Sequence, residues 1–218
     1  TIKQRGRLIV AVKNNLRPLG YQNASGELQG FEIDLARRLA EELLGDANAV
    51  ELRPVLNQDR LSAVLDGDVD IAIAHVSITA SRLRVVDFSL PYFRDGTAIA
   101  TTSPEIRASE DLAGRSIVAI NGSSAVDVIR AQIPNAQLVA ASSYAEAKSI
   151  LDSGQAIAIA ADLSVLVGWV QEFPQYRLLE SPLNSELISI VLPKGRQHAS
   201  MKQGINQAMT RLKNSGWL

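Results

Sequence analysis

The chain of 218 residues contains no cysteine and only two histidines, His75 and His198. Disulfides, thiol nucleophiles and thiolate metal sites are therefore excluded, and no spacing such as HxxxH indicates zinc. Aromatic residues are scarce, and no apolar run approaches the roughly 18 residues of a membrane-spanning helix. The formal net charge is −1 without a basic stripe. The sequence thus predicts no metal, no cofactor and no nucleic-acid partner.

The composition that remains, with 46% hydrophobic and 21% charged residues, is typical of a soluble globular protein. No charged segment followed by an apolar one opens the chain, as it would in a secretion signal. We therefore expect either that a signal has been removed or that the chain is a domain of something larger.

Apolar stretches rich in β-branched residues alternate with segments of helical period, which is typical of an α/β fold with mainly parallel strands. A first series predicts strands over 8–12, 50–55 and 70–76 with helices over 33–43 and 61–66. A second series predicts strands over 116–120, 137–140 and 156–161 with helices over 125–132, 144–152 and 163–173. In the first helix Ile33 and Leu39 share the apolar face, and we expect Glu32 to face water or flank that face.

Extended passages over 96–102 and 182–189 join the two series, and a strand over 189–192 and an amphipathic helix follow. The chain is thus expected to leave one lobe, build a second and return. We expect lobe 1 at 1–97 and 190–218, and lobe 2 at 98–189. Two lobes joined by two extended strands make a hinge with a cleft between them, which is a favoured place for small ligands.

The strand over 70–76 runs into small hydroxyl residues and then Arg82. An open α/β sheet presents hydroxyls, backbone N–H groups and a guanidinium to a ligand carboxylate at such strand ends. Ser123 and Ser124 follow another strand, at a helix start where N–H groups favour an anion. Plainer interpretations stay open, because a lone arginine is often a surface residue, Ser123 could be an ordinary N-cap, and Asp162 could cap the helix over 163–173.

Several segments together carry a resemblance that each alone would not: 26–36, 65–70, 77–82, 86–92, 111–114 and 122–124. In this order they resemble the periplasmic amino-acid-binding proteins of ABC importers, solute-binding protein family 3, which share their fold with ionotropic glutamate-receptor ligand cores. The resemblance implies the periplasmic-binding-protein type II fold, with two α/β lobes joined by two extended hinge strands.

The same resemblance implies a ligand site that is divided between the lobes. Arg82 and Ser77 would hold the α-carboxylate of an amino acid, and the helix start at Ser123 and Ser124 would support it from the second lobe. Asp162 would meet the α-ammonium group. One cation and one anion then match a zwitterion.

Specificity in this family depends on positions that correspond here to Lys13, Asn57 and Arg60. Two cations at these positions disfavour a basic ligand and favour an acidic amino acid, glutamate or aspartate. A pocket with few aromatic residues leaves room for glutamine or asparagine, and both cations could instead be solvated or ion-paired. His75 stands where a small residue is common, and it either lies in the core beside a partner or lines the pocket.

The predicted protein is a monomeric, periplasmic binding protein rather than an enzyme. Its partners would be a free amino acid and an ABC permease. An alternative is the ligand-binding sensor domain of a membrane receptor, where a fused transmembrane module replaces the permease. A remote alternative is an enzyme similar to cyclohexadienyl dehydratase, with a cleft acid such as Glu186, although a charge on a connecting strand is usually exposed to solvent.

Overall fold

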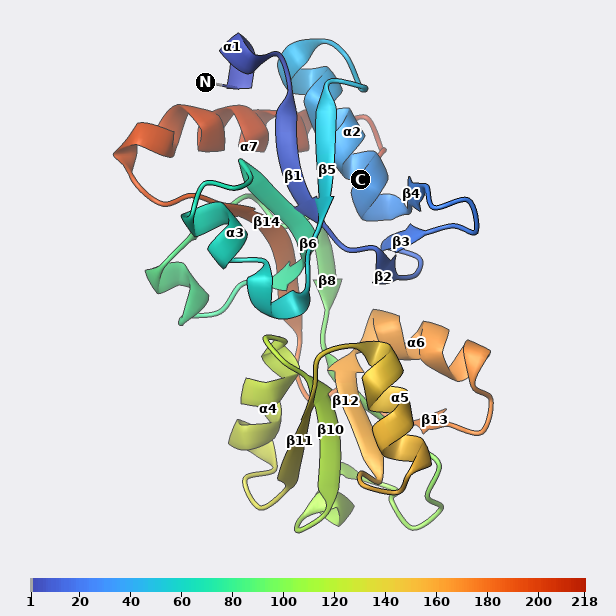
Figure 1. Ribbon diagram of the computed structural model, residues 1–218. Helices are drawn as coiled ribbons and strands as arrows, with labels where there is room; N and C mark the ends of the chain where they lie inside the picture. Colours follow the sequence, from blue (N-terminus) through green and yellow to red (C-terminus); the bar gives the residue numbers. More distant parts are fainter. Residues whose placement is uncertain (1) are drawn as a thin grey trace. The chain divides into compact units, whose positions relative to one another are not determined.

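The computed structural model describes residues 2–218, which divide into two compact units (Figure 1). Unit 1 contains the chain up to Val55, then Asp59–Phe93 and Leu187–Leu218. Unit 2 contains Arg94–Glu186, with which the short stretch Leu56–Gln58 is grouped. Each unit is an α/β structure with its own sheet and its own core.

The chain passes between the units at 93/94 and 186/187, a few residues before the predicted boundaries at 97/98 and 189/190. The cause is strand pairing on each side. Thr97 already pairs with Asp162 in the sheet of unit 2, whereas Ile188 pairs with Ser77 in the sheet of unit 1. Residues 94–97 therefore belong with unit 2 and residues 187–189 with unit 1.

The main sheet of unit 1 has the strand order β5-β1-β6-β14-β7, and β8 also pairs with β14. The strands are β1 (Leu8–Val12), β5 (Val50–Pro54), β6 (Ile71–Ser77), β7 (Asp87–Phe88), β8 (Phe93–Asp95) and β14 (Glu186–Leu192). Strands β5, β1 and β6 are parallel, and β14 returns antiparallel to β6. A small separate sheet contains β2 (Asn15–Leu16), β3 (Gly20–Gln22) and β4 (Leu28–Gln29).

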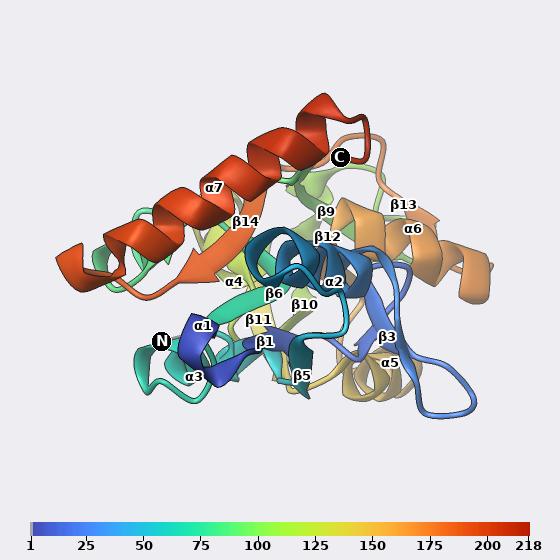
Figure 2. The same cartoon turned by 90° about the horizontal axis from the view of Figure 1, so that it is seen from above.

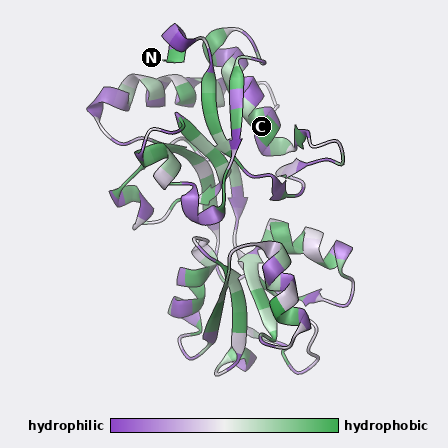
Figure 3. Ribbon diagram, in the orientation of Figure 1, coloured by the Kyte–Doolittle hydropathy of each residue, from purple (hydrophilic) through white to green (hydrophobic). Residues whose placement is uncertain are grey.

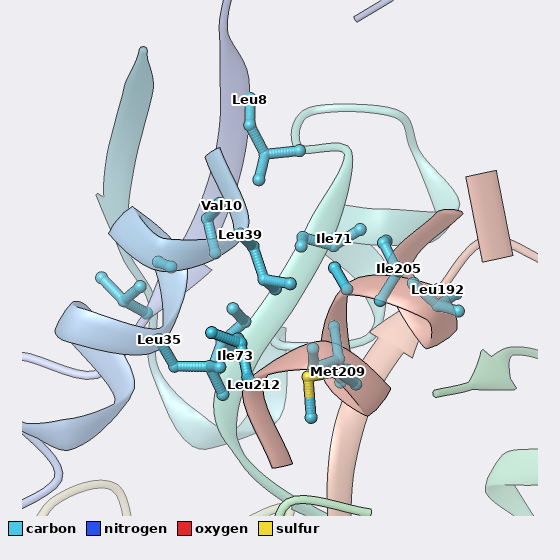
Figure 4. Packing of buried hydrophobic residues seen from close by; sticks show 14 of the residues in the cluster. Leu8, Val10, Leu35, Leu39, Ile71, Ile73, Leu192, Ile205, Met209 and Leu212 are labelled. Carbon is cyan, nitrogen blue, oxygen red and sulfur yellow. The ribbon is translucent and has the colours of Figure 1, made fainter. Parts of the chain in front are cut away.

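Both faces of the parallel strands are buried, because residues that alternate along a strand point to opposite sides. On one side α2 (Phe31–Leu44) and α7 (Ala199–Asn214) pack against each other and against the sheet (Figures 2 and 4). Their core includes Leu39, Met209 and Leu212 around Ile73. The opposite face packs against α3 (Ser62–Leu65), whose Ala63 and Val64 lie in one core cluster with residues of β1 and β6. The remaining short helices of unit 1 are α1 (Ile2–Arg5), η1 (Asn57–Asp59), η2 (Arg82–Arg84) and η4 (Arg196–His198), with η1 on the stretch grouped with unit 2.

Unit 2 has the strand order β11-β10-β12-β9-β13, in which β10, β11 and β12 are parallel and β9 is antiparallel. Its elements are β9 (Thr97–Thr101), η3 (Ser109–Leu112), β10 (Ser116–Ile120), α4 (Ser124–Gln132), β11 (Gln137–Ala141), α5 (Tyr144–Asp152), β12 (Ala158–Asp162), α6 (Leu163–Glu172) and β13 (Arg177–Leu178). The central strands are apolar along most of their length, and the helices are amphipathic (Figure 3).

The first prediction concerns the core of unit 1. Ile73 lies on the central strand β6 with no exposed surface, so Ile73→Ala leaves a cavity and should lower the free energy of unfolding by about 2–5 kcal/mol. Val85→Ala, at a side chain that is 46% exposed, is the control and should change little. Urea unfolding of the variants measures both, and equal losses would contradict this description of the core.

Candidate functional site

The predicted site residues lie at the carboxyl ends of parallel strands in each unit. In unit 1, β1 ends just before Lys13, and β6 ends at Ser77 with Arg82 in the next turn. In unit 2, β10 ends just before the turn that contains Ser123, and β12 ends at Asp162. Parallel neighbouring strands place their carboxyl ends at one edge of a sheet, where ligands of open α/β sheets bind. The structure thus brings each set of residues together within its own unit.

The end of β6 forms a tight turn that holds Arg82 near the strand. The Arg82 guanidinium donates to the Ser77 carbonyl at 2.8 Å, and the Arg82 N–H donates to the Thr79 hydroxyl at 3.3 Å. Ser77 is buried, and Arg82 is half-buried. The turn preorganises a guanidinium beside a buried serine, which is suited to a carboxylate.

Lys13 is a buried cation, with only 2% of its surface exposed. Its ammonium group donates to the Val55 carbonyl at 3.0 Å. The pKa of Lys13 is lowered from 10.5 to about 8, first by burial and then by the nearby Arg60 charge, whereas Glu32 and Asp59 oppose this shift. Lys13 is thus mostly charged at neutral pH, and its buried charge lowers the free energy of unfolding.

Arg60, also buried, donates from one nitrogen to the carbonyls of Ala74 and His75, at 2.9 and 2.7 Å. These carbonyls belong to β6, so the guanidinium supports the strand that leads to Ser77 and Arg82. The sequence left two interpretations of Arg60 open, a side-chain specificity residue or a solvated or ion-paired cation. The structure shows that it also shapes the strand end.

Glu32, in the first turn of α2, is fully buried, and the prediction that it would face water or flank the apolar face was wrong. Its carboxylate accepts hydrogen bonds from the Tyr92 hydroxyl at 2.6 Å and from the His75 N–H at 2.8 Å. A signal was present in the sequence, because Glu32, Leu35 and Leu39 repeat at helical spacing and share a buried face. A carboxylate at such a position requires internal partners, which Tyr92 and His75 supply.

His75 has a positive φ of 54°, which is uncommon for a residue other than glycine. Two charged side chains hold this conformation, since Glu32 accepts from the His75 N–H and Arg60 donates to the His75 carbonyl. The imidazole is also buried, with Nδ1 3.5 Å from the Glu32 carboxylate. This position fits the interpretation of a core histidine beside a partner, while a ligand contact stays a prediction.

Tyr92 is held by Glu32 and lies against the core of unit 1. Its pKa is raised well above the ordinary value, first by burial and then by the Glu32 carboxylate. Tyr92 therefore stays a neutral donor to Glu32 throughout the physiological range.

In unit 2 the start of α4 contains Ser123 and Ser124, the residues predicted to support an anion. Ser123 is the N-cap residue, but its hydroxyl makes no capping bond and is a buried atom without a hydrogen-bond partner among the described residues. Ser124 is also buried, and its hydroxyl donates to the Glu186 carboxylate at 2.7 Å. The interpretation of Ser123 as an ordinary side-chain cap is therefore wrong.

Asp162 occupies the N-cap position of α6, yet its side chain makes no capping hydrogen bond, so the capping interpretation from sequence was wrong as well. The N-terminal N–H groups of α6 have other acceptors. Leu163 N–H donates to the Gly96 carbonyl at 2.8 Å, and Ser164 N–H donates to the Asp95 carboxylate at 3.2 Å. Sequence reasoning missed Asp95, because nothing in the local pattern links residue 95 to a helix that begins at 163.

The remaining predicted residues have less defined surroundings. Asn57 begins η1, on the stretch that is grouped with unit 2. Tyr144, at the start of α5, packs with its ring 6.5 Å from that of Trp169. Among residues 2–218 no three metal-ligating side chains cluster, and no helix there has the length and hydropathy to span a membrane.

Comparison with known proteins connects this geometry to a family. The model of the bacterial extracellular solute-binding proteins, family 3, matches residues 8–218. The chain belongs to this family. It is a solute-binding protein and not an enzyme, and the relatives are amino-acid-binding proteins of ABC transporters.

Two relatives of the family and one solved structure are particularly similar. The ABC transporter glutamine-binding protein GlnH of Bacillus subtilis is 32% identical over 218 residues, which are 99% of this chain and 79% of the relative. A glutamine-binding protein of Geobacillus stearothermophilus is 35% identical over 188 residues, 85% of this chain and 72% of the relative. The solute receptor for L-cysteine of Neisseria gonorrhoeae has a TM-score of 0.93 at 27% identity, covering 99% and 87% of the two chains. The predicted type II fold is confirmed.

The second prediction concerns the buried charge of Lys13. Between pH 8 and 10.5 the unfolded chain binds a proton at Lys13 that the folded chain does not, so the stability contributed at this site rises with pH. The unfolding free energy of the wild type should therefore gain about 3 kcal/mol over that of Lys13→Met across this range. Urea unfolding from pH 7 to 10.5 measures the difference. Lys213→Met, at an exposed lysine, is the control, and a Lys13→Met difference that stays constant with pH would contradict the buried charge.

Proposed function

We propose that the protein binds a free L-amino acid with an acidic side chain, glutamate or aspartate, between its two lobes. Hinge closure would trap the ligand, and the closed form would be recognised by the permease of an ABC importer at the periplasmic side of the membrane. The observation that carries the choice of side chain is the pair of buried cations, Lys13 and Arg60, at the strand ends of unit 1.

Charge balance supports this choice. Arg82 and Asp162 match the α-carboxylate and α-ammonium groups of any amino acid. Among the fully buried groups around Lys13, the two cations Lys13 and Arg60 face one carboxylate, Glu32. Asp59 also acts on Lys13 but is partly exposed, so solvent screens its charge. One positive charge is left over, and a side-chain carboxylate would neutralise it.

Closure itself is a population shift between open and closed forms. A ligand favours the closed form only by its differential affinity for it, so contacts from both lobes are required. The proposed contacts meet this requirement, because Ser77 and Arg82 belong to unit 1 whereas Ser123 and Asp162 belong to unit 2.

Glutamine is the second candidate. Two similar relatives are named as glutamine-binding proteins. The lowered pKa of Lys13, about 8, also brings a neutral amine within reach of ordinary conditions, and a neutral amine accepts a hydrogen bond from an amide. The binding of glutamate should therefore depend more strongly on the charge of Lys13 than the binding of glutamine does.

The third prediction separates a residue that binds every amino acid from one that selects the side chain. Calorimetric titration with glutamate, glutamine, alanine and arginine measures both. Arg82→Ala should abolish binding of every amino acid, because it removes the partner of the shared α-carboxylate. Lys13→Met should instead cost glutamate about 2–5 kcal/mol and leave alanine nearly unchanged. Lys13→Met is preferred to an Arg60 variant, because Arg60 also holds β6. Tight arginine binding without a response to glutamate would refute the proposed ligand, and retained affinity in Arg82→Ala would refute the site.

A further inference from the structure

Asp95 is a buried carboxylate with no part in the ligand site described above. It lies on β8, where the first connecting strand enters unit 2, and only 9% of its surface is exposed. The carboxylate accepts from the Gly96 N–H at 2.9 Å, the Ser164 N–H at 3.2 Å and the Ser164 hydroxyl at 2.5 Å. Asp95 thus fixes the first turn of α6 to the connecting strand.

Asp95 takes the role in the first turn of α6 that Asp162 would ordinarily have as the N-cap residue. An aspartate at an N-cap position ordinarily accepts from the N–H groups of the following turn. Asp162 stands at that position but makes no such bond. Because Asp95 already accepts from Ser164 and the Gly96 carbonyl accepts from Leu163, the first turn has acceptors other than the Asp162 side chain.

A second connection of the same kind occurs at the other connecting strand. Glu186, on β14 where the chain leaves unit 2, is buried, and the expectation that a charge there would be exposed was wrong. It accepts from the Ser124 hydroxyl in the first turn of α4, next to Ser123, whose hydroxyl does not cap. Asn184 donates to Glu186 and accepts from the Thr97 N–H, both at 2.7 Å, so the two connecting strands are linked within unit 2.

We propose that Asp95 is a positioning residue for the amino-acid site: by capping α6 from the connecting strand, it keeps the Asp162 carboxylate out of the cap, in the position from which it would meet the ligand ammonium. This inference rests on the proposed function, in which Asp162 meets that ammonium. Asp95 itself touches no ligand. Its effect on affinity passes through Asp162.

A double-mutant cycle tests the proposal. Glutamate and glutamine affinities are measured by calorimetry for the wild type, Asp95→Ala, Asp162→Asn and the double variant. Asp95→Ala should weaken binding of both ligands about tenfold when Asp162 is present, and less than about twofold when residue 162 is asparagine. Both ligands carry the α-ammonium group that Asp162 would meet. The affinities for glutamate and glutamine should therefore fall by the same factor.

Asp111→Ala is the matched control. Asp111 also accepts two backbone N–H groups in unit 2, from Arg107 and Ala108, but it lies at η3 and not at either connecting strand. Its removal should leave affinity unchanged. If Asp95→Ala does not fold, Ser164→Ala takes its place in the cycle, because it deletes only the hydroxyl donor; the expected loss is then about threefold.

The outcomes are distinct. Equal losses from the Asp95 substitution in both backgrounds would overturn the positioning role and leave Asp95 a residue of stability alone. A wild-type protein that binds no amino acid would instead refute the proposed function. Non-additive losses with an unaffected Asp111→Ala variant would support the inference.

Discussion

The buried carboxylate of Glu32 is the interaction on which unit 1 depends most. It joins three parts of the fold, since it lies on α2, accepts from the His75 N–H of β6 and accepts from the hydroxyl of Tyr92, the residue before β8. Removing any partner would leave a buried charge or donor unsatisfied, which costs several kcal/mol. Its negative charge also acts on Lys13. One side chain therefore sets both the shape of a strand end and the charge beside it.

Unit 2 uses a related arrangement with different groups. Each of its two connecting strands contributes a buried carboxylate, Asp95 or Glu186, to the first turn of a helix. At α6 the carboxylate accepts a backbone N–H, from Ser164, and the side chain of the N-cap residue Asp162 makes no capping bond. At α4 the carboxylate accepts from the Ser124 hydroxyl, and the N-cap residue Ser123 also makes no side-chain capping bond. In both units, charged residues that are remote in sequence support the strand ends that carry the proposed binding residues.

Much of this architecture could be predicted from the sequence, because it depends on local pattern. The strands over 8–12 and 116–120 and the helix over 144–152 occur with the predicted bounds. The roles of Glu32, Asp95 and Glu186 could not, since each depends on a partner far along the chain; Asp95 and Ser164 are 69 residues apart. The capping role considered for Asp162 failed for the same reason, because Asp95 and the Gly96 carbonyl accept from the first turn of α6. Local propensity identified the right positions, but long-range acceptors decided what the side chains do.

The central claim is that the buried cluster of Lys13, Glu32 and Arg60 selects the ligand side chain by charge. The most direct test is the ratio of the dissociation constants for glutamate and glutamine from pH 7 to pH 9, a ratio that cancels the titration of the ligand α-amino group. Because Lys13 has a pKa of about 8, glutamate should weaken about tenfold relative to glutamine over this range. A ratio that does not change with pH would contradict the claim.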